Sequence, residues 1–140
     1  MPSQQKMPNC YGSRVLLSDV MLYLFAKEAE KREQCKLPMR SIYKVMSKLE
    51  SDFEDLDISI TFEKTGTDLY SRRIDEAMYY LMPFDIQIVN PSFSILLEKE
   101  AANRRLRKLD QCLPDTVRKK LDVMFSKFDN ALLEVSPVHS

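Results

Sequence analysis

The fold of this chain is decided by residues 68–97, whose sequence is DLYSRRIDEAMYYLMPFDIQIVNPSFSILL. The first half predicts a helix, because apolar residues recur at helical spacing and form one side from Leu69, Ile74, Ala77, Met78 and Leu81. Asp68 or Ser71 can cap this helix, and Pro83 ends it. The second half predicts a β-hairpin over about 84–97, because the turn-forming Asn90-Pro91-Ser92 is flanked by the alternating residues Ile86, Ile88, Phe93, Ile95 and Leu97.

Three elements are expected before this stretch. A first helix begins at Ser13 and is apolar around much of its circumference until Lys27, where a charged run extends to Glu33. A second helix spans about 38–50, with Pro38 at its start and apolar residues in steps of three and four. Between residues 58 and 63, apolar and polar residues alternate, which predicts a short strand with one buried face.

Two helices are expected after the hairpin, because apolar residues return to helical spacing beyond Leu97 and Pro114 divides the region. The order helix, helix, strand, helix, hairpin, helix, helix predicts a mainly α fold of the α+β class. Two glycines against seven prolines also disfavour an all-β fold. A chain of 140 residues suits a single domain over 13–133, with a flexible arm at 1–12 and a tail at 134–140.

This order of elements is that of a winged helix, in which a third helix can enter a groove of DNA while the hairpin contacts the flank. The commonest arrangement has its short strand between the first and second helices, whereas the strand expected at 58–63 follows the second helix. The sequence therefore predicts a winged-helix-like core with a β-hairpin and two C-terminal helices.

Residues 60–81 and the hairpin resemble the middle of the Panacea or SocA-type antitoxin domain. The resemblance is carried by Ile60-Thr61-Phe62-Glu63 as the Phe-containing strand, by Tyr70-Ser71 as the end of a Tyr-Gly-Pro-Tyr-Ser-like turn, and by the apolar helix that follows. Thr67-Asp68-Leu69 stands where that family has Tyr-Gly-Pro. The resemblance covers residues 15–130 and implies a non-enzymatic domain that binds a toxin or serves as an adaptor.

The composition argues against several classes of protein. Lys plus Arg and Asp plus Glu each number 21, so no net charge draws the chain to a nucleic acid or an anionic membrane. The N-terminus has no continuous apolar segment of a signal peptide, and no stretch approaches the roughly 18 apolar residues of a membrane span. Cys10, Cys35 and Cys112 lack the spacing of a zinc site or a disulfide framework, which favours a reducing cytoplasm.

Catalysis is not expected. The single histidine, His139, is the penultimate residue, where a catalytic arrangement would have to use the end of the chain. The acidic residues between 52 and 57 lack the internal Gly and terminal Glu of a calcium loop, so a solvated acidic loop is the simpler interpretation. Gly12 and Gly66 stand alone, so no phosphate loop exists. We expect no enzyme, no metal site and no cofactor.

The charges are nevertheless unevenly distributed. Residues 103–120 contain seven cationic side chains and two carboxylates, whereas residues 50–68 contain seven carboxylates and one lysine. A basic face can hold phosphates, opposed patches can join two copies or dock a charged partner, and both faces can equally be plain solvated surface. The candidate nucleic-acid-binding residues are Arg72 and Arg73 in the first turn of the third helix and, on the basic face, Arg104, Arg105, Arg107 and Lys108.

Two functions follow from the sequence, both of them regulatory and non-catalytic. The first is DNA binding of winged-helix type, with Arg72 and Arg73 at the groove, although Asp75 and Glu76 weaken phosphate affinity there. The second is an antitoxin-like or adaptor function that uses the apolar hairpin and helix surfaces to bind a protein. A homodimer formed through the long C-terminal helix is expected with either function. Tyr79 and Tyr80, at the end of the third helix, can be core residues, support for the hairpin or aromatic residues of an interface, and structural packing is the favoured interpretation.

Overall fold

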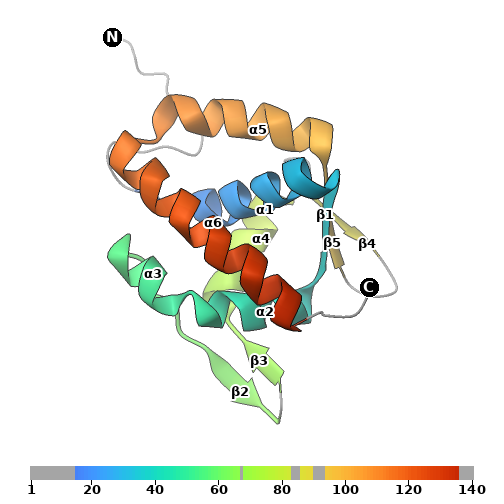
Figure 1. The fold of residues 1–140 in the computed structure, drawn as a ribbon. Helices are drawn as coiled ribbons and strands as arrows, with labels where there is room; N and C mark the ends of the chain where they lie inside the picture. The colour runs from blue at the N-terminus through green and yellow to red at the C-terminus, as the bar shows by residue number, and fades with distance from the viewer. Residues whose placement is uncertain (1–14, 67, 83–85, 90–93, 136–140) are drawn as a thin grey trace.

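The computed structural model of the chain describes residues 15–66, 68–82, 86–89 and 94–135. These residues form six helices and five short strands, arranged around the central helix α1, Leu17–Arg32 (Figure 1). The α+β class is confirmed, since the fold is mainly helical with a small antiparallel sheet. The predicted arm at 1–12, the turn at 90–92 and residues 136–140 of the tail lie outside the described residues.

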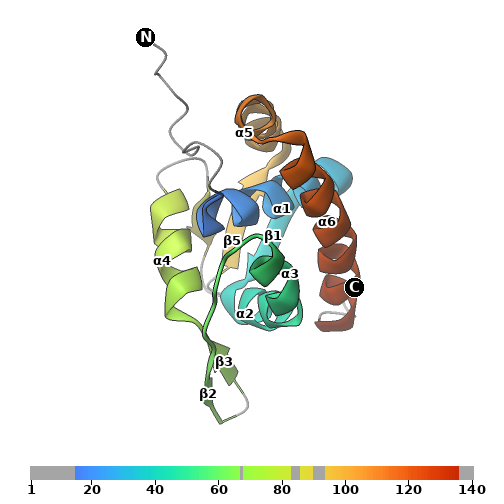
Figure 2. The ribbon, with the colours of Figure 1, turned by 90° about the vertical axis from the view of Figure 1, so that its left-hand side faces the viewer.

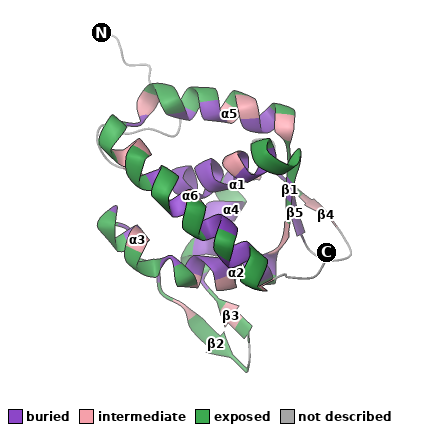
Figure 3. Ribbon diagram, viewed as in Figure 1, coloured by how far each residue is buried: buried purple, intermediate pink, exposed green. Residues whose placement is uncertain are grey.

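Helix α1 is the core of the fold. Twelve of its sixteen residues are buried, and Figure 3 shows most of the helix in the buried colour, with an exposed end. A helix that is apolar on all sides needs cover on all sides, and α1 packs against α4 (Arg72–Leu81), α5 (Lys99–Cys112) and α6 (Asp115–Val135). The expected solvated end is present, because residues 30–33 are exposed.

The three-stranded sheet has the order β1-β5-β4 and is antiparallel throughout. Its strands are β1 (Gln34–Pro38), β4 (Gln87–Val89) and β5 (Ser94–Glu98). The expected hairpin is confirmed by β4 and β5, in which Ile88 lies directly opposite Ile95. Ile86 and Ile95 are buried, so the alternation correctly predicted the inner face of the hairpin, while Phe93 lies outside the described residues.

The prediction of a strand at 58–63 is wrong for residues 58–62. Ile58 and Ile60 are buried and Ser59 and Thr61 are exposed, so the alternation did report a one-sided burial. Among the described residues, however, no strand pairs with this segment. Pairing begins at Glu63, where β2 (Glu63–Thr65) meets β3 (Asp68–Tyr70) in a second, two-stranded sheet.

The strand β1 was not predicted. Its partner β5 is about sixty residues away, with Cys35 opposite Leu97, so nothing in the local sequence announces the pairing. The strand follows a left-handed turn at Glu33, whose φ is 74°, and its last residue is Pro38. A proline is tolerated there because β1 is at the edge of the sheet. The short strand therefore lies between the first two helices and not after them.

The second helix predicted at about 38–50 is confirmed as α2 (Met39–Lys48), and it is followed at once by a short helix that was not predicted, α3 (Glu50–Asp55). Ile42, Val45 and Met46 form the buried side of α2, as their spacing indicated. The acidic residues expected in a solvated loop lie partly on α3, because Phe53 is fully buried and anchors this short helix to the core.

Two C-terminal helices are confirmed. Helices α5 and α6 are separated at Leu113-Pro114, and α6 crosses α1 (Figure 1).

None of the helices in the described part of the chain combines the length and the apolar character of a membrane span. Cys35 is a buried free thiol. Cys112 is disulfide-bonded, although the spacing of the cysteines in the sequence indicated no disulfide framework.

Candidate functional site

The candidate site is built on α4, which follows β3 directly. Ser71 caps the helix, as its Oγ accepts a hydrogen bond from the backbone N–H of Ile74 at 3.3 Å. This confirms one of the two predicted caps. The inner side of the helix consists of four buried residues, Ile74, Ala77, Met78 and Leu81. The outer side is therefore fixed in space and consists of Arg72, Arg73, Asp75, Glu76, Tyr79 and Tyr80.

The charges on this outer side have partners within the molecule. Arg72 Nε lies 3.5 Å from a carboxylate oxygen of Glu76, one turn along the helix. Arg73 donates a hydrogen bond to the backbone carbonyl of Ser59 at 2.7 Å. Asp75 accepts one from the hydroxyl of Tyr43 at 3.1 Å. Two arginines and two carboxylates also cancel in formal charge, so the exposed side of α4 is electrically neutral.

Tyr79 and Tyr80 are exposed, contrary to the expectation that they pack inside. Their exposed fractions are 76% and 50%, and Tyr79 is the most exposed of the large apolar or aromatic side chains that the structure describes. They follow Ala77 and Met78, which take the buried positions of that turn. Two tyrosines on the outside of a helix add aromatic surface and two phenolic hydroxyl groups to a neutral face.

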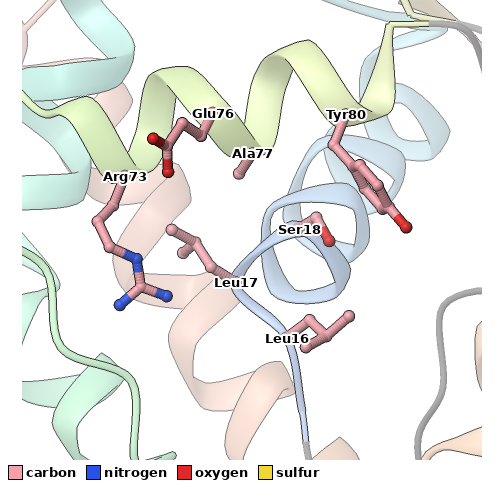
Figure 4. A pocket seen from close by; sticks show the side chains of 7 residues that line it. All are labelled: Leu16, Leu17, Ser18, Arg73, Glu76, Ala77 and Tyr80. Atoms are coloured by element: carbon pink, nitrogen blue, oxygen red, sulfur yellow. The ribbon is translucent and has the colours of Figure 1, made fainter.

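A pocket of about 240 Å³ opens between α4 and the start of α1 (Figure 4). Leu16, Leu17 and Ala77 supply apolar surface, Ser18, Arg73 and Glu76 supply polar groups, and the ring of Tyr80 stands at one end. This is a small hollow with apolar walls and charged edges, and it continues the exposed side of α4. It has room for one side chain of a partner molecule.

Asp19 is buried beside this pocket, one residue after the pocket residues of α1. Only 1% of its surface is exposed, and neither carboxylate oxygen has a hydrogen-bond partner among the residues that the structure describes. Burial raises the pKa of Asp19 to about 7, and the nearby backbone N–H of Leu16 offsets part of the effect without the geometry of a full hydrogen bond. The only signal in the sequence was a single carboxylate inside the apolar run from Val15 to Phe25.

The predicted basic residues of α5 lie elsewhere. Arg104, Arg107 and Lys108 are exposed along the outer side of this helix, and Arg105 is half-buried. Helix α1 packs against both α4 and α5 and lies between them (Figure 2). The structure therefore keeps Arg72 and Arg73 together on one helix and Arg104–Lys108 together on another, and does not join the two groups into one surface.

The acidic region of the sequence contacts two lysines of α6 at the surface, one at the end of the basic region, Lys120, and one beyond it, Lys127. Lys127 Nζ on α6 lies 2.8 Å from Asp52 Oδ1 on α3, and Lys120 donates to the backbone carbonyl of Asp55 at 3.3 Å. A second pocket, of about 370 Å³, lies between these two helices. Lys120 and Lys127 thus help to hold α3 against α6.

A further charge cluster, which the sequence did not reveal, joins the end of α1 to α6. Asp129 accepts hydrogen bonds from Lys31 at 2.5 Å and from Arg32 at 3.0 Å, and Arg32 also contacts Glu28 at 2.6 Å. Burial by itself would raise the pKa of Asp129, but hydrogen bonds from the two cations hold it below its ordinary value. Burial raises the pKa of Glu28. The cluster connects residues about a hundred positions apart and is structural in character.

Among the described residues, no group of three His, Cys, Asp or Glu side chains is placed to hold a metal ion. Comparison of the chain with models of protein families, with curated proteins and with solved structures finds no match. The resemblance to the Panacea or SocA-type domain stays a prediction, and function has to be argued from the surfaces described above.

Proposed function

We propose that this chain is a non-catalytic protein-binding module of winged-helix type that acts as an antitoxin-like or adaptor domain. The proposal is carried by one observation, the exposed side of α4, where Tyr79 and Tyr80 stand beside charges that cancel. Tyrosine and arginine are enriched among the residues that contribute most to protein interfaces. The adjoining pocket offers such a partner an apolar hollow.

The topology supports the winged-helix part of the proposal. The short strand β1 lies between α1 and α2, as in the commonest winged helix, and α4 is followed by a hairpin of the same sheet. In that arrangement α4 takes the place of the third helix, the one that faces a ligand, and the short α3 is an addition before it. The β2–β3 hairpin is an addition that projects from the body just before α4 (Figures 1 and 2).

The charges favour a protein partner over DNA at α4. A helix that enters a DNA groove gains affinity from cations that neutralise phosphates, whereas Arg72 is paired with Glu76 and Arg73 with a backbone carbonyl. Tyr79, the most exposed of these side chains, suits a desolvated contact with another protein.

Photo-crosslinking tests the proposal. A photoreactive phenylalanine in place of Tyr79 is expected to attach a protein on irradiation in cells, while the same group in place of Val123 serves as the control. Val123 is also exposed, at 58%, but lies on α6 and away from α4. Equal labelling from both positions would contradict a protein site on α4.

DNA recognition is the second candidate, favoured by the exposed row of Arg104, Arg107 and Lys108 on α5. A salt titration of binding to random and genomic duplexes distinguishes the two functions. If phosphates are the target, replacing Arg104, Arg105, Arg107 and Lys108 by Ala flattens the salt dependence by about one unit for each phosphate that is no longer neutralised. A specific complex at near-physiological salt that survives Tyr79→Ala would replace the proposed function.

A further inference from the structure

The middle of the exposed side of α4 is a stripe formed by Arg72, Glu76 and Tyr79. Their spacing of four and three residues places them above one another on the helix surface. The side chains of Arg72 and Glu76 are 82% and 67% exposed, and Tyr79 is 76% exposed. The stripe is held rigidly, because the opposite side of the helix is buried against the core. It therefore presents a fixed pattern of charge and aromatic surface to any partner.

The charges along this helix are self-complementary. Residues 72–76 are Arg-Arg-Ile-Asp-Glu, so two cations precede two carboxylates around a central apolar residue. Reversing the direction of the segment exchanges the signs at every charged position. Two antiparallel copies, related by a two-fold axis at the level of Ile74, place Arg72 opposite Glu76 of the second copy and Arg73 level with Asp75. A two-fold interface requires this kind of self-complementarity.

The same pairing brings Tyr79 against the second copy. This residue lies five positions beyond Ile74, or about 7.5 Å along the helix axis. The point at the same distance in the other direction lies beyond the first residue of α4, where Ser71 and the end of β3 at Tyr70 precede the helix. Tyr70 is 37% exposed and Leu69 is half-buried, and the β2–β3 hairpin projects beyond this end of α4 (Figure 2). Tyr79 of each copy then meets an apolar part of the hairpin of the other.

From this pattern we infer that α4 is a self-association surface whose partner is a second copy of this chain, paired antiparallel through Arg72 and Glu76. The inference rests on the proposed function, that α4 binds protein, and names the partner. Exposed ion pairs add little affinity, so the charges mainly set the register while the tyrosines supply the contact area. The dimer differs from the one expected from the sequence, which used the long C-terminal helix.

Charge reversal tests the register. In Arg72→Glu, carboxylates face each other across the two-fold axis, and in Glu76→Arg, cations do. We expect each single variant to dimerise at least tenfold more weakly than the unchanged chain in sedimentation experiments. An equimolar mixture of the two variants is expected to recover the dimer as a heterodimer, because every facing pair is then opposite in sign. The variant that carries both reversals keeps the complementarity and is expected to form a homodimer.

This pattern separates a loss of association from a loss of folding, because two misfolded variants do not restore each other. Lys119→Glu, at an exposed position of α6, is the control and is expected to leave the dimer unchanged, while Tyr79→Ala is expected to weaken it. The inference is overturned if the protein without substitutions is monomeric at every concentration. It is also overturned if neither Arg72→Glu nor Glu76→Arg changes the affinity of the dimer. If the photoreactive group at position 79 then attaches a different protein, the proposed function stands without it, and if it attaches none, both fail.

Discussion

The substitution Asp19→Asn tests the most unusual group in the core, a buried carboxylate that has no hydrogen-bond partner in the described part of the chain. Its ordinary pKa of 3.8 is raised to about 7 by burial. At about 1.4 kcal/mol for each pH unit, this difference corresponds to about 4 kcal/mol of stability. This value is a large part of the free energy of unfolding of a typical domain, which is roughly 5–15 kcal/mol.

The sign of the change in the free energy of unfolding with pH follows from proton binding. Between pH 4 and 7, the folded state binds the Asp19 proton and the unfolded state does not, so the free energy of unfolding falls as the pH rises. Asparagine has nearly the same shape and does not ionise. The variant and the unchanged protein are therefore expected to be of similar stability at pH 4, whereas the variant is expected to be more stable by up to about 4 kcal/mol at pH 8.

Urea unfolding followed by far-ultraviolet circular dichroism at several pH values measures this difference. The difference between the two proteins isolates Asp19, because all other titrating groups are common to both. Glu30→Gln, an exposed carboxylate on the same helix, is the control and is expected to stay parallel to the unchanged protein. A difference between Asp19→Asn and the unchanged protein that is constant from pH 4 to pH 8 would refute the assignment of an ionisable, unpaired group in the core.

Three further predictions concern the contacts that hold the fold. Ser71→Ala removes the α4 cap and is expected to lower the free energy of unfolding by about 1 kcal/mol, measured by urea unfolding; an unchanged value would contradict the cap. Phe128→Ala leaves a cavity beside Phe25, whose ring centroid lies 6.1 Å from that of Phe128, and is expected to lower the free energy of unfolding by about 3–5 kcal/mol. A decrease as small as that for an exposed side chain would contradict the packing of α6 against α1. Because the pKa of Asp129 is lowered in the folded state, its carboxylate stabilises the fold at neutral pH, and this stabilisation is lost as acid protonates it. Asp129→Asn is therefore expected to lower the free energy of unfolding, measured by urea unfolding, more at pH 7 than at pH 3. An equal loss at both pH values would contradict the prediction.

Local patterns predicted local structure well. The cap at Ser71, the buried side of α4 and the β4–β5 hairpin are encoded within a few residues of each other, so spacing and turn chemistry were sufficient. The segment at 58–62 shows the limit, because alternation reports which side chains are buried and says nothing about a hydrogen-bonding neighbour. The strand β1 shows the opposite case, since its partner is far away in the sequence.

The candidate site was only half accessible from the sequence. Arg72 and Arg73 were placed correctly in the first turn of their helix, but their internal partners Glu76 and Ser59 became evident only in three dimensions. Tyrosine has an apolar ring and a polar hydroxyl, so composition alone did not decide on which side of α4 Tyr79 and Tyr80 would lie. The separation of α4 from α5 could not be predicted either, because it depends on how α1 is enclosed.

The position of α6 has a consequence for synthesis on the ribosome. The side of α1 that bears Phe25 is closed by Phe128, and the end of α1 is tied to Asp129, so both contacts wait for residues translated about a hundred codons later. When only α1 to α5 have emerged from the ribosome, the apolar surface of α1 that α6 covers in the complete fold is still exposed. During that interval the chain is a substrate for chaperones that bind exposed apolar segments, and its resistance to proteases should appear abruptly once α6 has emerged.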